Sequence, residues 1–186
     1  MTTSSSKKDL WWLPIGLAGL AVCCPLVFAG NTHWPQFRGP QASGIGEGQP
    51  PPLRWELATG ENVLWRVPVP GLGHASPIVW GDRVYVATAV KPGEAQLKVG
   101  LYGDIASVNE PEPHQWRLLA FDLATGRVLW NTLAHEGVPR QRRHTKASQC
   151  NSTPATDGKH IVALLGSEGL FCFDAEGRRL WRRDLG

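Results

Sequence analysis

The sequence is poor in the features that mark several common classes of protein. Its formal net charge is only +3 over 186 residues, whereas nucleic-acid binding calls for a strongly basic face carried by a recognisable module. It contains no G-x-S-x-G elbow, no glycine-rich phosphate loop and no HExxH sequence, so none of these catalytic motifs points to a reaction. Acidic residues occur singly in expected turns, and we name no catalytic residue.

Helical patterning is also missing after residue 30. What the chain contains instead is a repeat, AFDLATGRVLW at residues 120–130 and CFDAEGRRLW at residues 172–181. Upstream of each copy lies a second pair of matching stretches, residues 76–84 and 153–161. The repeat is therefore a whole structural unit rather than a short motif, as in propellers and solenoids.

The spacing within the repeat predicts a β-hairpin. Asp122 can accept backbone N–H bonds in the turn, and Gly126 can take a positive φ, so the flanking apolar strands fold back on each other. Trp130 lies on the outgoing strand and shares one face with Val128 and Thr132 by period-two alternation. We expect its indole to pack between adjacent sheets and to donate its N–H to a backbone carbonyl.

A third, weaker copy runs from Glu56 to Gly60 and leads to Trp65. Together the copies resemble the pyrroloquinoline-quinone-like (PQQ-like) β-propeller family, whose repeats carry an Ala-x-Asp-x-x-Thr-Gly-x-x-x-Trp docking motif. The segment WPQFRGP at residues 34–40 also resembles the stretch that precedes the propeller in secreted bacterial members. The docking residues implied by this resemblance are Ala120, Asp122, Thr125, Gly126, Trp130, Asp174, Gly177, Trp181 and Trp65.

The resemblance implies an all-β fold, a β-propeller of four-stranded antiparallel blades. We expect blades at about residues 74–133 and 151–186 within a partial propeller over 62–186. Their strands are expected near 76–79, 83–89, 117–122 and 127–133 in the first unit. The strand predicted at 62–69, which carries Trp65, has no inner strands before it. About two full blades plus one orphan outer strand favour a fragment of a longer protein, and self-association of short chains into a ring is the alternative.

The amino terminus is typical of a targeting segment. Lys7 and Lys8 precede an uncharged stretch over residues 10–30, which predicts a signal peptide cleaved after Ala29. An uncleaved membrane anchor is the alternative, because the stretch is long enough to span a bilayer, and Cys23 faintly suggests a lipoprotein site. Each version places the following domain outside the cytoplasm, in the periplasm or beyond. Residues 31–61 are expected to be irregular.

Four cysteines need separate interpretations. Quinoprotein dehydrogenases of the PQQ-like family carry an adjacent cysteine pair against the cofactor, and Cys23 and Cys24 are adjacent here. Both lie inside the apolar leader, where they serve as hydrophobic filler. Cys150 and Cys172 could pair in an oxidising compartment, but Cys172 stands in the small-residue slot that Ala120 fills in the first copy, which favours a free thiol.

Two long connections are expected on one face of the blades. The first blade has about 25 extra residues at 91–115, and residues 134–150 link the two blades; insertions on one face often mark a binding face. The alternative is a solvated surface without a partner. Five basic side chains on the link could engage an acidic or phosphate-bearing partner, and two further residues are expected at the mouth of the central channel. The candidates are Arg140, Arg142, Arg143, His144 and Lys146 on the link, and His74 and Asn151 at the mouth.

These observations favour a non-enzymatic extracytoplasmic module that binds protein or envelope partners, with no nucleic acid and with membrane contact only through the leader. A second hypothesis is a quinoprotein dehydrogenase that oxidises an alcohol or sugar with pyrroloquinoline quinone and Ca²⁺; only under this alternative do we expect a cofactor or a metal. A third is a sensor or accessory domain of a larger multidomain protein.

Overall fold

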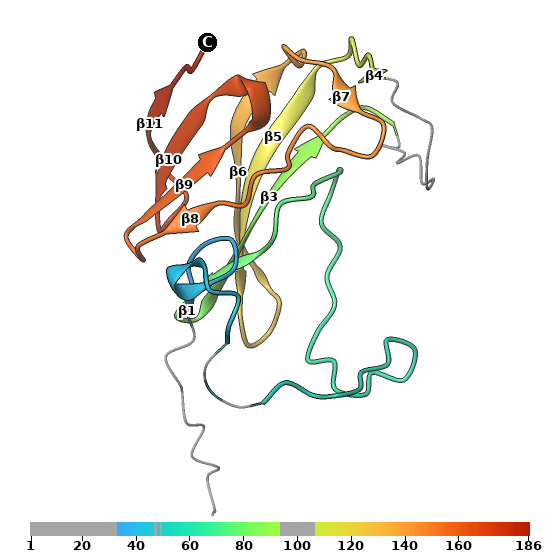
Figure 1. The fold of residues 1–186 in the computed structure, drawn as a ribbon, viewed down its shortest axis with the longest axis vertical. Helices are drawn as coiled ribbons and strands as arrows, with labels where there is room; N and C mark the ends of the chain where they lie inside the picture. The colour runs from blue at the N-terminus through green and yellow to red at the C-terminus, as the bar shows by residue number, and fades with distance from the viewer. Residues whose placement is uncertain (1–32, 47, 49, 94–106) are drawn as a thin grey trace, which may run out of the picture.

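The computed structural model describes residues 33–46, 48, 50–93 and 107–186, and in these ranges the chain is all-β. Two antiparallel sheets make up most of the molecule, and a two-stranded ribbon lies at one end (Figure 1). The remaining regular structure is two 3-10 turns, η1 at Pro40–Ala42 and η2 at Gly166–Glu168.

The first sheet has the strand order β1-β2-β3-β5-β6. Its strands alternate between two faces, as the period of a β-strand requires. Tyr85 and Trp116 are buried on one face, whereas Val84 and Phe121 belong to a separate cluster on the other. The strands are β1 (His33–Trp34), β2 (Ile78–Trp80), β3 (Arg83–Val90), β5 (His114–Asp122) and β6 (Val128–Gly137).

The second sheet has the order β11-β10-β9-β8 and repeats the four main strands of the first. The repeat extends to the pairing register, because Ala120 lies opposite Trp130 in the first sheet and Cys172 lies opposite Trp181 in the second. The small-residue slot predicted from the sequence is therefore the position that faces the tryptophan. The strands are β8 (Ala155–Thr156), β9 (His160–Leu164), β10 (Leu170–Asp174) and β11 (Arg179–Arg183).

One hydrophobic core joins the two sheets. Tyr85 and Trp116 from the first sheet and Ile161 and Phe171 from the second all belong to the same buried cluster, and each is at most 2% exposed. Four-stranded antiparallel sheets that pack face to face in chain order are blades of a propeller. The fold is therefore a partial β-propeller, as the sequence predicts, with β2, β3, β5 and β6 as the first blade and β8 to β11 as the second.

Two details differ from the sequence-based expectations. The predicted strand at 62–69 is wrong, because that segment is extended but hydrogen-bonds to no sheet among the described residues. Its alternate residues Trp65 and Val67 instead pack against the outer cluster of the first blade. The segment expected to be irregular also contributes β1, which extends the first blade to five strands by pairing with β2.

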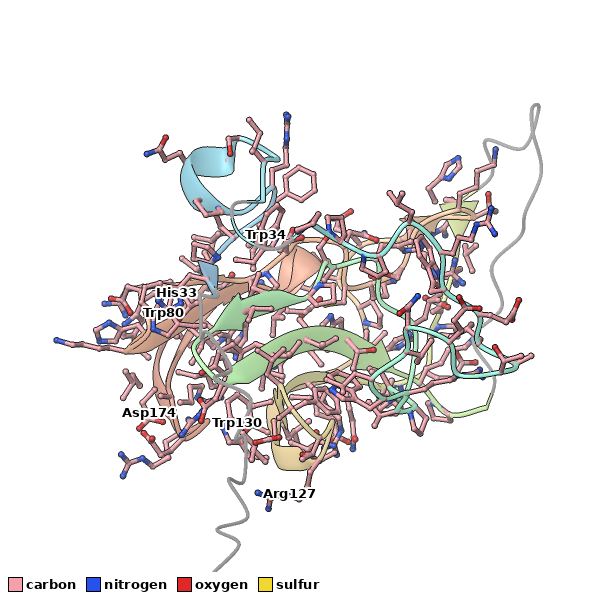
Figure 2. The ribbon with its side chains drawn as sticks, turned by 90° about the horizontal axis from the view of Figure 1, so that it is seen from below. His33, Trp34, Trp80, Arg127, Trp130 and Asp174 are labelled. Atoms are coloured by element: carbon pink, nitrogen blue, oxygen red, sulfur yellow. The ribbon has the colours of Figure 1, made fainter. Side chains whose placement is uncertain are left out.

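Strand β1 ties the innermost strands of the two blades together. His33 stacks on Trp80, with ring centroids 4.1 Å apart, and its Nδ1 accepts a hydrogen bond from the Gly81 N–H. The Pro35 carbonyl accepts another from the Thr156 N–H of the second blade. Figure 2 shows His33, Trp34 and Trp80 together at this end of the molecule, opposite the end that carries β4 and β7 (Figure 1).

In the described part of the chain, no helix has the length and apolar character needed to cross a membrane. The predicted leader at residues 1–30, with Cys23 and Cys24, lies outside the described residues.

Candidate functional site

The hairpin turn of the first blade receives a tryptophan from the segment before it. The Asp122 carboxylate accepts hydrogen bonds from the N–H and hydroxyl of Thr125, at 2.8 and 2.6 Å, and these bonds lower the pKa of Asp122. The closed turn presents the Leu123 carbonyl, which accepts the Trp65 indole N–H at 2.8 Å. Gly126 has φ of 70°, and a Cβ there would stand 2.7 Å from the Trp65 ring. Only glycine leaves room for the indole.

The turn of the second blade receives Trp130 from the first in the same way. The indole donates its N–H to the Ala175 carbonyl at 3.0 Å, and Thr132 donates its hydroxyl to the Gly177 carbonyl at 2.8 Å. A Cβ at Gly177 would stand 2.6 Å from the Trp130 ring. Figure 2 shows Trp130 beside Asp174. We call residues 122–126 and 174–177 docking turns, because each binds the tryptophan of the preceding unit. Trp181 is 39% exposed.

A second constellation lies at the other end of the blades, where the 91–115 insertion meets the inter-blade link. Strand β4 (Ser107–Val108) of the insertion pairs with β7 (Arg143–His144) of the link. The two long connections therefore form one ribbon on one face, which we call the ribbon face. Residues 94–106 of the insertion lie outside the described residues.

A buried ion pair supports the ribbon face. Arg143 donates from Nε and Nη2 to the two oxygens of Glu110, both at 3.0 Å, and from Nη1 to the Ala147 carbonyl at 3.0 Å. Burial by itself would raise the pKa of Glu110, but hydrogen bonds from Arg143 and Gln149 outweigh it and lower the pKa. Both side chains are at most 6% exposed, so Arg143 holds the link in place from inside rather than presenting its charge to solvent.

Arg140 also has carboxylate partners. Its guanidinium donates to both oxygens of Asp184, at 2.7 and 2.8 Å, and these bonds hold the pKa of Asp184 well below its usual range. Its backbone N–H donates to the buried Glu168, which also lies 3.2 Å from His135 Nε2. Burial lowers the pKa of His135. Arg140 therefore fastens the link to the second blade.

Three basic side chains of the link remain at the surface: Arg142, His144 and Lys146 are exposed. Arg142 and His144 line an open groove of about 380 Å³, together with Asn151 at the end of the link and Gly166 and Ser167 from the second blade. The groove is therefore polar and carries positive charge at its rim.

His74 and Asn151, the two residues predicted at the channel mouth, lie on segments that are joined by a backbone hydrogen bond. The His74 N–H donates to the Cys150 carbonyl, the residue before Asn151. The Asn151 amide bonds to Ser148 through both its oxygen and its nitrogen, which fixes the turn at the end of the link. Both side chains are exposed, and Asn151 reaches the groove.

Sequence reasoning missed the acidic partners Glu110 and Glu168. They lie in connections, far along the chain from the arginines they bind, and no periodic pattern marks them. Cys150 and Cys172 are both buried free thiols, and burial raises the pKa of Cys150 to about 12. Within the described residues, no three His, Cys, Asp or Glu side chains gather in a way that could hold a metal ion.

Comparison with known protein families identifies the family to which the chain belongs. A family model described as outer membrane protein assembly factor BamB matches residues 48–183, which include both blades and all the docking turns. The chain belongs to this PQQ-like β-propeller repeat family. No curated protein gives a significant match.

Membership in the PQQ-like repeat family accounts for the docking turns as cohesion between blades. The partly buried Trp65 and Trp130 and the buried Gly126 and Gly177 hold one unit against the next. The ribbon face takes no part in these docking contacts. Its groove and exposed cations are the candidate functional site.

Proposed function

We propose that this chain is an extracytoplasmic propeller module that binds an acidic segment of a protein partner in the cell envelope through its ribbon face. The family to which it belongs is described by an outer membrane assembly factor, and this supports an envelope location and a binding role. The predicted leader over residues 10–30 points to the same side of the membrane.

The proposal is carried by a difference among the basic residues of the link: two arginines are paired with carboxylates, and the other side chains are exposed to solvent. Glu110 neutralises Arg143, and Asp184 and Glu168 neutralise Arg140, so these two arginines hold the link rigid. Arg142 and His144 stay exposed along the groove, and Lys146 is exposed two residues after His144 on the same link. A rigid groove with a cationic rim loses little conformational entropy on binding and attracts acidic segments.

The test is a charge reversal of the two exposed cations of the link, Arg142 and Lys146. A fluorescently labelled Asp/Glu-rich peptide is titrated with the wild type and with the double variant Arg142→Glu, Lys146→Glu, and binding is read as anisotropy at two salt concentrations. We expect affinity to fall about tenfold or more in the variant, since each exposed ion pair contributes up to about 1 kcal/mol. We also expect the wild-type affinity to weaken with salt.

Lys159→Glu is the matched control, because Lys159 is an exposed lysine in the turn before β9, away from the groove. It should leave the affinity within about twofold of the wild type. Equal binding by the wild type and the double variant, or equal binding of a Lys-rich peptide of the same length, would exclude the ribbon face as an acidic-segment site.

A further inference from the structure

A buried carboxylate joins the two walls of the groove. Glu168 in η2 is 1% exposed and follows Gly166 and Ser167, which line the groove on the side of the second blade. Its Oε1 accepts the backbone N–H of Arg140 at 3.1 Å, and its Oε2 lies 3.6 Å from the Nε of the same arginine. Arg142, two residues further along the link, lines the groove on the opposite side. Glu168 therefore holds the wall formed by the link against the wall formed by the second blade.

A histidine of the first blade contacts the same carboxylate. His135 lies on β6, and its Nε2 stands 3.2 Å from the Oε2 of Glu168, the oxygen that the Nε of Arg140 also faces. The side chain of His135 is 18% exposed. Its ring packs against two fully buried aromatic rings of the shared core, those of Trp116 and Phe171, at centroid distances of 5.4 and 6.1 Å. His135 therefore reaches the contact between the two walls from the core that joins the blades.

Among the described residues, three charged groups face His135: the carboxylate of Glu168 and the guanidinium groups of Arg140 on the link and Arg182 on β11. Burial has the largest effect on the pKa of His135 and lowers it. Arg182 and Arg140 also lower this pKa, and Glu168 compensates only in part. The ring is therefore neutral at neutral pH, and a neutral ring with its proton on Nε2 can donate to Glu168.

A proton added to His135 introduces a new cation beside a carboxylate that Arg140 already uses. The imidazolium and the guanidinium then share one oxygen, Oε2 of Glu168, and their like charges repel each other. The buried imidazolium also loses hydration, which it regains when the link moves away from η2. Protonation of His135 therefore favours separation of the two walls.

We propose that His135 is a proton-sensitive latch that holds the two walls of the groove together at neutral pH and lets them separate in acid. The inference rests on the proposed function, because the site that the latch regulates is the acidic-segment groove. The pKa of His135 is lowered in the closed groove, so the stabilisation of the closed form is fully present above the open-state pKa of about 6.5 and is lost as the pH falls below it. The affinity for an acidic segment falls with it, because separated walls no longer form a preorganised groove.

Hydrogen exchange of the Arg140 backbone N–H, which donates to Glu168, measures the latch without any ligand. We expect its protection factor, which is corrected for the intrinsic exchange rate, to fall about threefold to tenfold between about pH 7.5 and pH 5.5. Tenfold is roughly the limit that an open-state pKa of about 6.5 sets over this range.

Two variants assign the effect to His135. His135→Gln, whose amide can still donate to Glu168, is expected to abolish the pH dependence of the Arg140 protection factor. His144→Gln is the matched control, because it removes an exposed histidine of the link, and it should retain the pH dependence. The Asp122 N–H, which is bonded within the first-blade docking turn, shows whether each variant is folded and should be equally protected in all three proteins.

A second measurement tests whether the latch controls binding. The affinity for a labelled Asp-rich peptide is compared at the two pH values in the His144→Gln background, so that the charge of the exposed His144 does not contribute. We expect the affinity to fall about threefold to tenfold on acidification, and we expect the additional change His135→Gln to remove this fall.

The two measurements separate the latch from the proposed function. Arg140 protection that is equal at both pH values, or that falls equally in His135→Gln, would overturn the latch. A peptide affinity that does not change with pH, while the Arg140 N–H loses protection, would overturn its control of the groove. Absence of peptide binding at both pH values, together with the expected exchange result, would reject the proposed function and support the latch.

Discussion

At the scale of single residues, burial decides which charges are structural and which are free. Arg142 and Arg143 are neighbours in the sequence, and nothing in their local pattern distinguishes them. Arg143 is 7% exposed and bonded to Glu110, whereas Arg142 is exposed beside the groove. The sequence could identify a basic link, but the assignment of each arginine depends on Glu110, which lies 33 residues away.

This division predicts the effect of removing the buried carboxylate. Glu110→Gln leaves the buried Arg143 without its counter-charge, and we expect the free energy of unfolding to fall by about 3 kcal/mol or more at neutral pH. Arg142→Met, the exposed neighbour, should change it by less than about 0.5 kcal/mol. Denaturant unfolding monitored by tryptophan fluorescence measures both.

The pair of Glu110 and Arg143 also makes the free energy of unfolding depend on pH. The pKa of Glu110 is lowered in the folded state. The stabilisation that its carboxylate provides is therefore fully present above the unfolded-state pKa of about 4.3. It is lost as the pH falls through the lower folded-state pKa. The difference in stability between the wild type and Glu110→Gln should therefore shrink below about pH 4. A difference that is constant from pH 7 to pH 3 would show that the carboxylate charge is not what stabilises the pair.

At the scale of elements, the docking turn is the unit that the sequence predicted best. Asp122, Gly126 and Trp130 have their roles because a closed turn needs a side-chain acceptor and a positive φ, and these needs are local. The strand predicted around Trp65 failed because strand formation needs a hydrogen-bonding partner, and partners are not local. Strand β1 was missed for the same reason, since two residues carry no periodic pattern and the pairing with Trp80 is long-range.

A pair of glycine variants measures what a docked indole adds to a turn. Gly126→Ala and Gly60→Ala impose the same left-handed strain of about 1–2 kcal/mol, but only Gly126→Ala also collides with a ring, that of Trp65. Gly126→Ala should therefore destabilise the protein more, with the excess visible in thermal unfolding at low protein concentration. Equal losses would mean that Trp65 does not occupy the first-blade turn in solution.

At the scale of the whole molecule, the two packed blades have two distinct ends. Residues 33–35 bridge β2 and β8 at one end, and the ribbon of β4 and β7 lies at the other end (Figure 1). The groove lies beside this ribbon. The class of fold and the order of the blades could be read from the repeat. The groove could not, because it is lined by the link and by residues 166 and 167 of the second blade, which are distant in the sequence and meet only in the folded structure.

Tryptophans docked in turns hold the repeats together, and hydrogen exchange of the indole N–H groups tests this role most directly. With ¹⁵N-labelled tryptophan, the Trp65 and Trp130 indole signals should exchange at least about tenfold more slowly than that of Trp55, which is 67% exposed. Exchange of Trp65 and Trp130 as fast as that of Trp55 would contradict the account.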